Sequence, residues 1–181
     1  MSHFQADAKI LMLPGCGNSG PAHWQSRWEA EDPSFRRVAQ DDWMHPIRAD
    51  WQARLEDAVA QTGPDTLLVA HSLGCLLVAH WAANTRLRIK AALLVAVPDA
   101  AGAEFPSAAI GFACPPMQPL PFRSLVVASS DDPYGNLDYA RGCATAWRSE
   151  LANIGAAGHI NALSGLGRWE KGFGLLRRLR K

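Results

Sequence analysis

LVAHSLGCLL, residues 68–77, decides how this 181-residue chain folds. The apolar run TLLVA (66–70) predicts a strand that is buried on both faces. After Ser72 the pattern changes. The residues expected to face a core now recur at helical spacing, at Leu73, Leu76, Leu77, His80 and Trp81. The sequence therefore predicts a strand, a very tight turn at Ser72, and a helix.

A serine in such a turn has unusual surroundings. Its hydroxyl stands above the sheet, at a helix N-terminus where free backbone N–H groups favour negative charge. The turn is crowded, so the residues two before and two after the serine must be small, and they are Ala70 and Gly74. This matches the G-x-S-x-G nucleophile elbow, with alanine in the first glycine position. A helix-capping serine at an ordinary strand–helix turn fits the same residues, so the motif alone leaves both interpretations open.

A nucleophilic serine needs a base, because its hydroxyl is a poor nucleophile at neutral pH. In this architecture the chain order is serine, acid, histidine. Two histidines follow Ser72. His80 lies two turns along the predicted helix and cannot reach back to the turn. The candidate base is therefore His159, in the loop AAGHIN (156–161).

The base in turn needs a carboxylate to orient it, at the end of the preceding strand. LVVASSDDPYG (125–135) supplies two, Asp131 and Asp132. We prefer Asp132, because Pro133 fixes the chain immediately after it. Asp131 is then a solvated turn residue or a loop cap. The choice between the two carboxylates stays open at this point.

Attack on a carbonyl also creates an oxyanion, which two backbone N–H groups would stabilise. We expect one from Leu73, directly after the serine, and the other from the loop PGCGNSG (14–20), with Cys16 as the candidate donor. Gly15 and Gly17 let the backbone of this loop approach a ligand closely. A phosphate cradle is the other interpretation of the loop. It fits poorly, because the loop lacks both the Lys-Ser/Thr pair of a P-loop and G-x-G-x-x-G spacing.

The rest of the chain alternates short apolar runs with helical patterns. Strands are predicted at 9–15, 35–39, 91–97, 124–130 and 149–154. Helices are predicted at 21–31, 47–62, 136–149 and 167–180. Apolar strands separated by helices indicate a parallel sheet covered on both faces, which is a three-layer α/β sandwich. The exception is 98–123, which carries six prolines and no clear period; such a segment is usually functional or mobile.

Composition narrows the function classes. A formal net charge of +1 gives no general attraction to nucleic acid or to anionic lipid. The basic run RRLRK (177–181) is expected to be a solvated helix end. The four cysteines show no C-x-x-C spacing, and no His, Cys, Asp and Glu cluster has metal-ligand spacing. We therefore expect no metal site and no cofactor.

The same features suggest a location. Scattered cysteines in a chain of this length suit a reducing compartment, residues 1–9 are too polar for a signal peptide, and no apolar stretch is long enough to cross a bilayer. The length fits one domain. We expect a single cytoplasmic domain over 1–181, as a monomer or a homodimer. Nothing indicates nucleic acid, a membrane or a protein partner.

Five motifs together carry a resemblance. They are LPGCGNSGPAHW (13–24), DDWMHPIRADW (41–51), VAHSLG (69–74), SSDDPYG (129–135) and AGHIN (157–161). In this order they resemble the α/β-hydrolase superfamily. The chain is most similar to the small serine hydrolases that include the retinoblastoma-binding protein nine and its bacterial relatives.

The resemblance implies both a fold and three roles. It implies Ser72 as nucleophile, Asp132 as acid and His159 as base. It also implies a sheet without the first two strands of larger hydrolases and without a large cap domain, so that 98–123 is a modest lid. We expect six mostly parallel strands in the order 2-1-3-4-5-6. Ala70 departs from the usual glycine of the superfamily, but alanine is small enough for the turn.

The tryptophans and histidines are expected in different places. Five tryptophans at helical spacing are expected in the core, namely Trp24, Trp28, Trp51, Trp81 and Trp147. Trp43 and His71 are pocket candidates, together with the glycines before and after Cys16. His45 is a cap, a surface residue or a substrate contact, and we favour the first two. His23 is expected to be structural or exposed.

The predicted activity follows from these residues. We expect a serine hydrolase that acts on a small ester, thioester or amide through a Ser-Asp-His triad and an acyl-enzyme, with a small acyl compound as its partner. A hydrolase-like scaffold for protein interaction is the alternative, although an idle site has no physical need for all three residues. Acyl transfer to an amine or an alcohol is a third use of the same chemistry.

Overall fold

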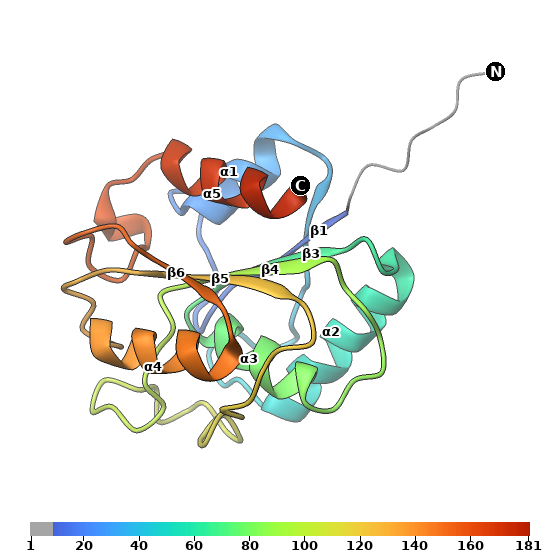
Figure 1. The fold of residues 1–181 in the computed structure, drawn as a ribbon, viewed down its shortest axis with the longest axis horizontal. Helices are drawn as coiled ribbons and strands as arrows, with labels where there is room; N and C mark the ends of the chain where they lie inside the picture. The colour runs from blue at the N-terminus through green and yellow to red at the C-terminus, as the bar shows by residue number, and fades with distance from the viewer. Residues whose placement is uncertain (1–8) are drawn as a thin grey trace.

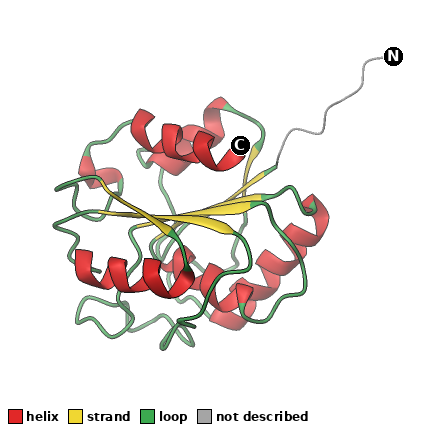
Figure 2. Ribbon diagram, in the orientation of Figure 1, coloured by secondary structure: helices red, strands yellow, loops and turns green. Residues whose placement is uncertain are grey.

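The computed structural model of the protein describes residues 9–181, and its centre is one sheet (Figures 1 and 2). The strands are β1 (Ile10–Leu13), β2 (Phe35–Arg37), β3 (Leu67–His71), β4 (Ala91–Val95), β5 (Arg123–Ala128) and β6 (Glu150–Asn153). Their order is β2-β1-β3-β4-β5-β6, as predicted, and every neighbouring pair is parallel. The prediction about a signal peptide concerns residues 1–9, of which the structure describes only Lys9.

Helices cover both faces of the sheet. They are α1 (Trp24–Glu31), α2 (Arg48–Thr62), α3 (Leu73–Ala82), α4 (Leu137–Trp147), α5 (Glu170–Arg180) and the short 3₁₀ helix η1 (Ala162–Ser164). Figure 1 shows α1 and α5 on one face and α2, α3 and α4 on the other. The predicted three-layer sandwich is therefore confirmed. Within residues 9–181, no helix is both long and apolar enough to cross a bilayer.

Successive side chains of each strand point to opposite faces of the sheet, so the interior consists of two hydrophobic cores. In β1, Leu11 and Leu13 face the core under α2, α3 and α4, whereas Ile10 and Met12 face the core under α1 and α5. The five tryptophans expected in the core are all at most 2% exposed: Trp24, Trp28, Trp51, Trp81 and Trp147. Both faces of the sheet are therefore sealed by helices that carry aromatic side chains.

Helix α3 is more deeply buried than its sequence pattern suggests. The spacing after Ser72 predicts one apolar stripe, yet every residue from Leu73 to Trp81 is buried. The sheet covers one side of α3, and α2 and part of 98–123 cover the other. His80, for example, contacts the Phe112 carbonyl oxygen at 3.4 Å. Because α3 is enclosed, the serine at its start is held by a rigid element.

Segment 98–123 is irregular, as predicted, and it is tied down at several points. It has no helix or full strand, only an isolated bridge between Ile47 and Ile110. Phe112 is fully buried in the core, and the Trp147 indole N–H donates to the Pro116 carbonyl oxygen at 2.9 Å. The segment therefore forms a modest cover and not a separate cap.

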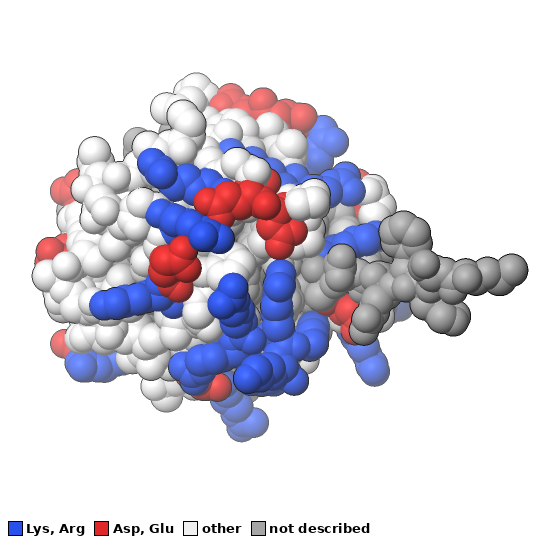
Figure 3. Space-filling view, turned by 90° about the horizontal axis from the view of Figure 1, so that it is seen from above, with Lys and Arg blue, Asp and Glu red and all other residues white. Residues whose placement is uncertain are grey.

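The basic run at the C-terminus is solvated, as predicted. Arg177 and Arg178 are exposed in the last turn of α5, where the helix dipole favours cations. Arg178 pairs with Glu150 at 2.9 Å, and the guanidinium of Arg177 lies 4.8 Å from the centre of the Phe173 ring. Figure 3 shows Lys and Arg side chains gathered on the face that α1 and α5 cover.

The contact between the Ser72 turn and β1 gives a first prediction, at Gly74. A Cβ atom built at Gly74 would lie 2.4 Å from the Leu13 carbonyl oxygen and 3.0 Å from that of Pro14. Backbone atoms cannot move away cheaply, so Gly74→Ala should lower the free energy of unfolding by about 3 kcal/mol. Urea unfolding followed by circular dichroism measures this.

The matched control is Gly142→Ala in α4, where a built Cβ meets no heavy atom within 4 Å. It should raise the free energy of unfolding by about 0.5–1 kcal/mol, because alanine favours helix. A Gly74→Ala protein as stable as the parent would show that the turn and β1 are not in tight contact.

Candidate active site

Ser72 has a strained backbone. Its φ is +54° and its ψ is −124°, a region that costs a residue with a side chain on the order of 1–3 kcal/mol. The Ser72 N–H donates to the Val95 carbonyl oxygen at 2.9 Å, which ties the turn to β4. Although Ser72 occupies the N-cap position of α3, its side chain makes no capping hydrogen bond. The capping interpretation left open by the sequence is therefore wrong, and the hydroxyl is free for another partner.

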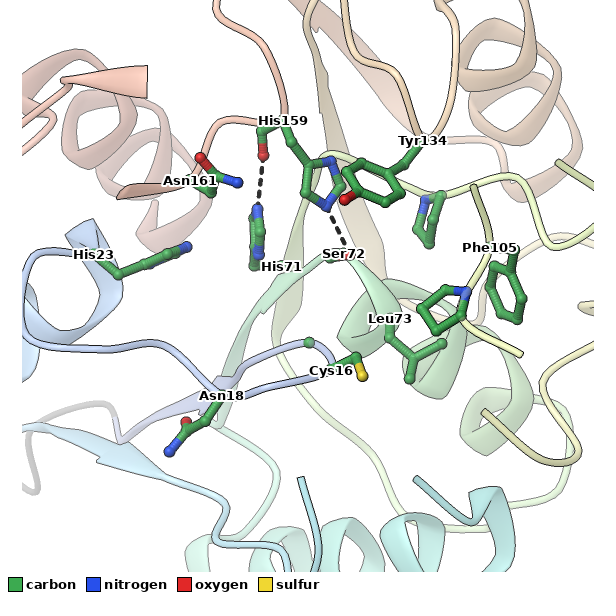
Figure 4. Close-up of a pocket in the computed structure, with 13 residues that line it drawn as sticks. Cys16, Asn18, His23, His71, Ser72, Leu73, Phe105, Tyr134, His159 and Asn161 are labelled. Atoms are coloured by element: carbon green, nitrogen blue, oxygen red, sulfur yellow. Dashed lines mark hydrogen bonds between the residues drawn. The ribbon is translucent and has the colours of Figure 1, made fainter. Parts of the chain in front are cut away.

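That partner is His159. Its Nε2 lies 2.8 Å from the Ser72 Oγ, and its Nδ1 lies 2.9 and 3.0 Å from the two carboxylate oxygens of Asp132 (Figure 4 shows the serine contact). A carboxylate only accepts hydrogen bonds, so Nδ1 carries the proton and Nε2 accepts from the serine hydroxyl. The side chains of Asp132 and His159 are only 1% and 9% exposed. The three groups form one hydrogen-bonded chain that is largely shielded from water.

The two adjacent carboxylates have different contacts. Asp132 faces His159, and its Oδ1 also accepts from the Tyr134 N–H at 3.0 Å. Asp131 is exposed, and its Oδ1 accepts from the Ser129 hydroxyl at 2.7 Å and from the N–H groups of Ala157 and Gly158 at 2.8 and 2.7 Å. These bonds, led by that of Ser129, lower the pKa of Asp131. Asp131 is thus a loop cap, and the loop that it fixes is the one that carries His159.

Loop 14–20 lies directly against the Ser72 turn. A Cβ atom built at Gly15 would lie 2.9 Å from the Ser72 Cβ and 3.3 Å from the Leu73 nitrogen, so only glycine fits there. Neither the Leu73 N–H nor the Cys16 N–H donates to a backbone carbonyl in the part of the chain that the structure describes. Both N–H groups that the sequence proposes as oxyanion donors thus have no backbone acceptor within residues 9–181, and their role stays a prediction.

A cavity of about 280 Å³ opens above Ser72 (Figure 4). Its lining includes Gly15, Cys16 and Leu73, together with Phe105 and Pro106 from segment 98–123. The predicted pocket residue His71 also lines this cavity.

Two other predicted pocket residues lie elsewhere. Gly17 and Trp43 are not among the residues that line the cavity. The Gly17 N–H donates to the Trp43 carbonyl oxygen at 2.8 Å, and the Trp43 ring packs edge-on against Trp51 in the core. Both residues support the loop that carries Cys16, one layer behind the cavity. His45, the other histidine of that region, is exposed and pairs with Asp42 at 3.0 Å.

The sequence missed several lining residues, among them Tyr134, Phe105 and Asn161. Tyr134 follows the candidate acid by two positions, and its ring centre lies 4.4 Å from that of His159. Its place in SSDDPYG was the one available signal. Phe105 lies in a stretch without a period, so nothing in the sequence could place it.

A row of histidines supports the base. The His71 Nε2–H donates to the His159 carbonyl oxygen at 2.9 Å, and the His23 ring packs edge-on against His71 with ring centres 4.7 Å apart. Burial, and then the charges of His159 and His23, hold the pKa of His71 well below its ordinary value. Burial, followed by the charge of Arg37, lowers the pKa of His23 to about 4. Both are thus neutral at neutral pH and place no positive charge beside His159.

His23 is structural, one of the two expectations for it, and it is buried. It caps α1, since its Nδ1 accepts from the Gln25 N–H at 3.2 Å. Within residues 9–181, no group of three or more His, Cys, Asp and Glu side chains is arranged to hold a metal ion.

Comparisons with known proteins identify the family of the chain. A family model described as serine hydrolase matches residues 10–178. A YdeN-like protein from Pectobacterium atrosepticum has a solved structure that is 30% identical, with a TM-score of 0.84, and the match covers 95% of this chain and 90% of that one. A comparison with curated proteins gives no significant match.

Two further solved structures share the fold at lower identity. The ydeN gene product of B. subtilis is 18% identical, with a TM-score of 0.79 and coverage of 94% of this chain and 97% of that one. The type II thioesterase BorB from the borrelidin biosynthetic cluster is 16% identical, with a TM-score of 0.67 and coverage of 96% and 92%. The predicted α/β-hydrolase fold is therefore confirmed.

The depressed pKa of His23 gives a prediction on stability. The folded chain holds this pKa at about 4, against 6.5 for an ordinary histidine, so the unfolded chain binds the proton more strongly. The contribution of His23 to stability is complete above about pH 6.5 and declines as the pH falls toward about 4. His23→Asn keeps a capping acceptor but does not titrate. It should reduce the loss of unfolding free energy between about pH 7 and about pH 5 by about 2 kcal/mol.

Urea unfolding at the two pH values measures this difference. Gln61→Asn in α2 is the control, because Gln61 is exposed and the change removes no titratable group. An unaltered pH dependence in His23→Asn would mean that His23 is not held neutral in the folded state.

Proposed function

The chain belongs to the serine hydrolase family, and from this premise we propose that it hydrolyses small acyl esters, thioesters or amides with Ser72, His159 and Asp132 as its catalytic triad. The observation that carries the proposal is the 2.8 Å contact between the Ser72 Oγ and the His159 Nε2. It occurs at a strained turn where the serine has no capping role. Strain of this kind persists where the surrounding structure holds it in place, and it concentrates at functional sites.

The first step is attack by the serine. The Ser72 Oγ bonds to the acyl carbon while its proton passes to the His159 Nε2. Asp132 keeps the other imidazole proton on Nδ1, so Nε2 is ready to accept, and the carboxylate then stabilises the imidazolium. Because His71 and His23 stay neutral, neither of them opposes the positive charge that develops on His159.

The oxyanion of the tetrahedral intermediate would lie between the N–H groups of Leu73 and Cys16. Each donor of this kind typically contributes about a hundredfold or more to the rate. The intermediate collapses when His159 returns its proton to the leaving heteroatom and the bond from the acyl carbon to that atom breaks. Water, activated by the same histidine, then attacks the acyl-serine and releases the acid, which restores the Ser72 hydroxyl.

The direct test is labelling with a fluorophosphonate probe, which reacts with activated serines. The native protein should be labelled, whereas Ser72→Ala and His159→Ala should not, and circular dichroism should show all three folded. Peptide mapping by tandem mass spectrometry should place the adduct on Ser72. A folded native protein that takes no label and hydrolyses no short ester would overturn the proposal and favour an interaction scaffold.

The two carboxylates give a sharper prediction. Asp132→Asn should lower kcat for a short ester by about a thousandfold or more, because the amide cannot hold the required tautomer of His159. Asp131→Asn should lower kcat by about tenfold at most, since an amide oxygen still accepts from the N–H groups of Ala157 and Gly158. Steady-state kinetics on the two variants decides between them. A larger loss in Asp131→Asn would assign the catalytic acid to the other carboxylate.

A further inference from the structure

A second hollow of about 350 Å³ adjoins the active-site cavity. It is formed by Pro133 and Tyr134 and by residues of 157–164, and we call it the loop groove. Tyr134, His159 and Asn161 line both the loop groove and the cavity above Ser72. The two hollows therefore meet at the proposed catalytic base.

An apolar side chain stands at the loop groove. Leu163 lines it and is 95% exposed. The turn that carries Leu163 is nevertheless well fixed. The Asn161 Oδ1 accepts from the Leu163 N–H at 2.9 Å, and the Ser164 hydroxyl donates to the Ala157 carbonyl oxygen at 2.6 Å. The backbone thus holds a leucine in solvent beside the active site, where it stabilises no core.

The proposed mechanism indicates which part of the substrate each hollow would bind. His159 must deliver its proton to the leaving heteroatom, so the leaving group has to lie on the His159 side of the serine. The acyl group then points away from His159, into the cavity beside Leu73 and Phe105. Figure 4 shows these two residues on one side of Ser72 and Asn161, which borders the loop groove, on the other.

We propose that the loop groove binds the leaving group, and that the substrate joins a compact acyl group to an extended, partly apolar alcohol or thiol. The cavity of about 280 Å³ lies at the lower end of the range for ligand pockets, roughly 300–1,000 Å³, so it suits a small acyl group. Leu163 and Pro133 provide apolar contact for the chain of the leaving group. This inference rests on the proposed function.

The test uses two isomeric esters of equal composition. Octyl acetate has a compact acyl group and a long leaving group, and ethyl octanoate has the reverse. The native enzyme should show a kcat/KM for octyl acetate at least about tenfold higher, because only this isomer places its chain in the loop groove. Equal values, or a preference for ethyl octanoate, would overturn the inference.

A variant assigns the effect to the loop groove. Leu163→Ser should raise KM for octyl acetate about fivefold and lower the ratio of kcat/KM for octyl acetate to that for ethyl acetate, since the short leaving group does not reach Leu163. Leu151→Ser in β6 is the matched control, because Leu151 is also exposed but lines neither hollow, and it should change neither substrate. An octyl acetate KM that is unaltered in Leu163→Ser would also overturn the inference.

Activity on ethyl acetate distinguishes a failure of the proposed function from a failure of the loop-groove assignment. If the native protein hydrolyses neither ethyl acetate nor the longer esters, the proposed function itself fails. If it hydrolyses ethyl acetate but does not prefer octyl acetate, the function stands and the assignment of the loop groove is wrong.

Discussion

The close contact between the Ser72 turn and the end of β1 is the constraint on which the site depends. Gly74 lies against the carbonyl oxygens of Leu13 and Pro14, and Gly15 lies against Ser72 itself. These approaches hold the first residues of α3 against loop 14–20, as the proposed pair of N–H donors at Leu73 and Cys16 requires. A larger residue at either glycine would separate the two donors and relax the turn. Fold stability and the proposed chemistry therefore depend on the same few contacts.

Burial sets the charge state of the histidines around the proposed base. His71 and His23 are kept neutral mainly because they are buried, and His71 still donates to the backbone of His159. A charged neighbour in this row would oppose the imidazolium that the mechanism requires. Within residues 9–181, Asp132 is the one carboxylate in contact with the imidazole, and it is buried. The proposed mechanism therefore places its transient positive charge on His159, while His71 and His23 stay neutral.

Much of this could be predicted from the sequence, because local patterns carry it. The apolar runs fix the strands, and the change of period at Ser72 fixes the turn. Chain order leads to His159, and the strand before Asp132 places this carboxylate at the same edge of the sheet as Ser72. These inferences need only the period of the apolar residues, the spacing of the motifs and the chain order of serine, acid and histidine.

What the sequence could not supply depends on contacts between distant segments. Phe105 comes from a stretch without a period, and Trp43 points into the core because loop 14–20 sits above it. The role of Asp131 was visible only once Ala157 and Gly158 were close to it. Asp131 fixes the start of segment 157–164, beside the proposed base His159, and a capping box fixes its end, where Leu163 is exposed. The Ser164 hydroxyl links the two ends, because it donates to the Ala157 carbonyl oxygen. Since the Leu163 side chain takes no part in these hydrogen bonds, replacing it leaves in place the bonds that position His159.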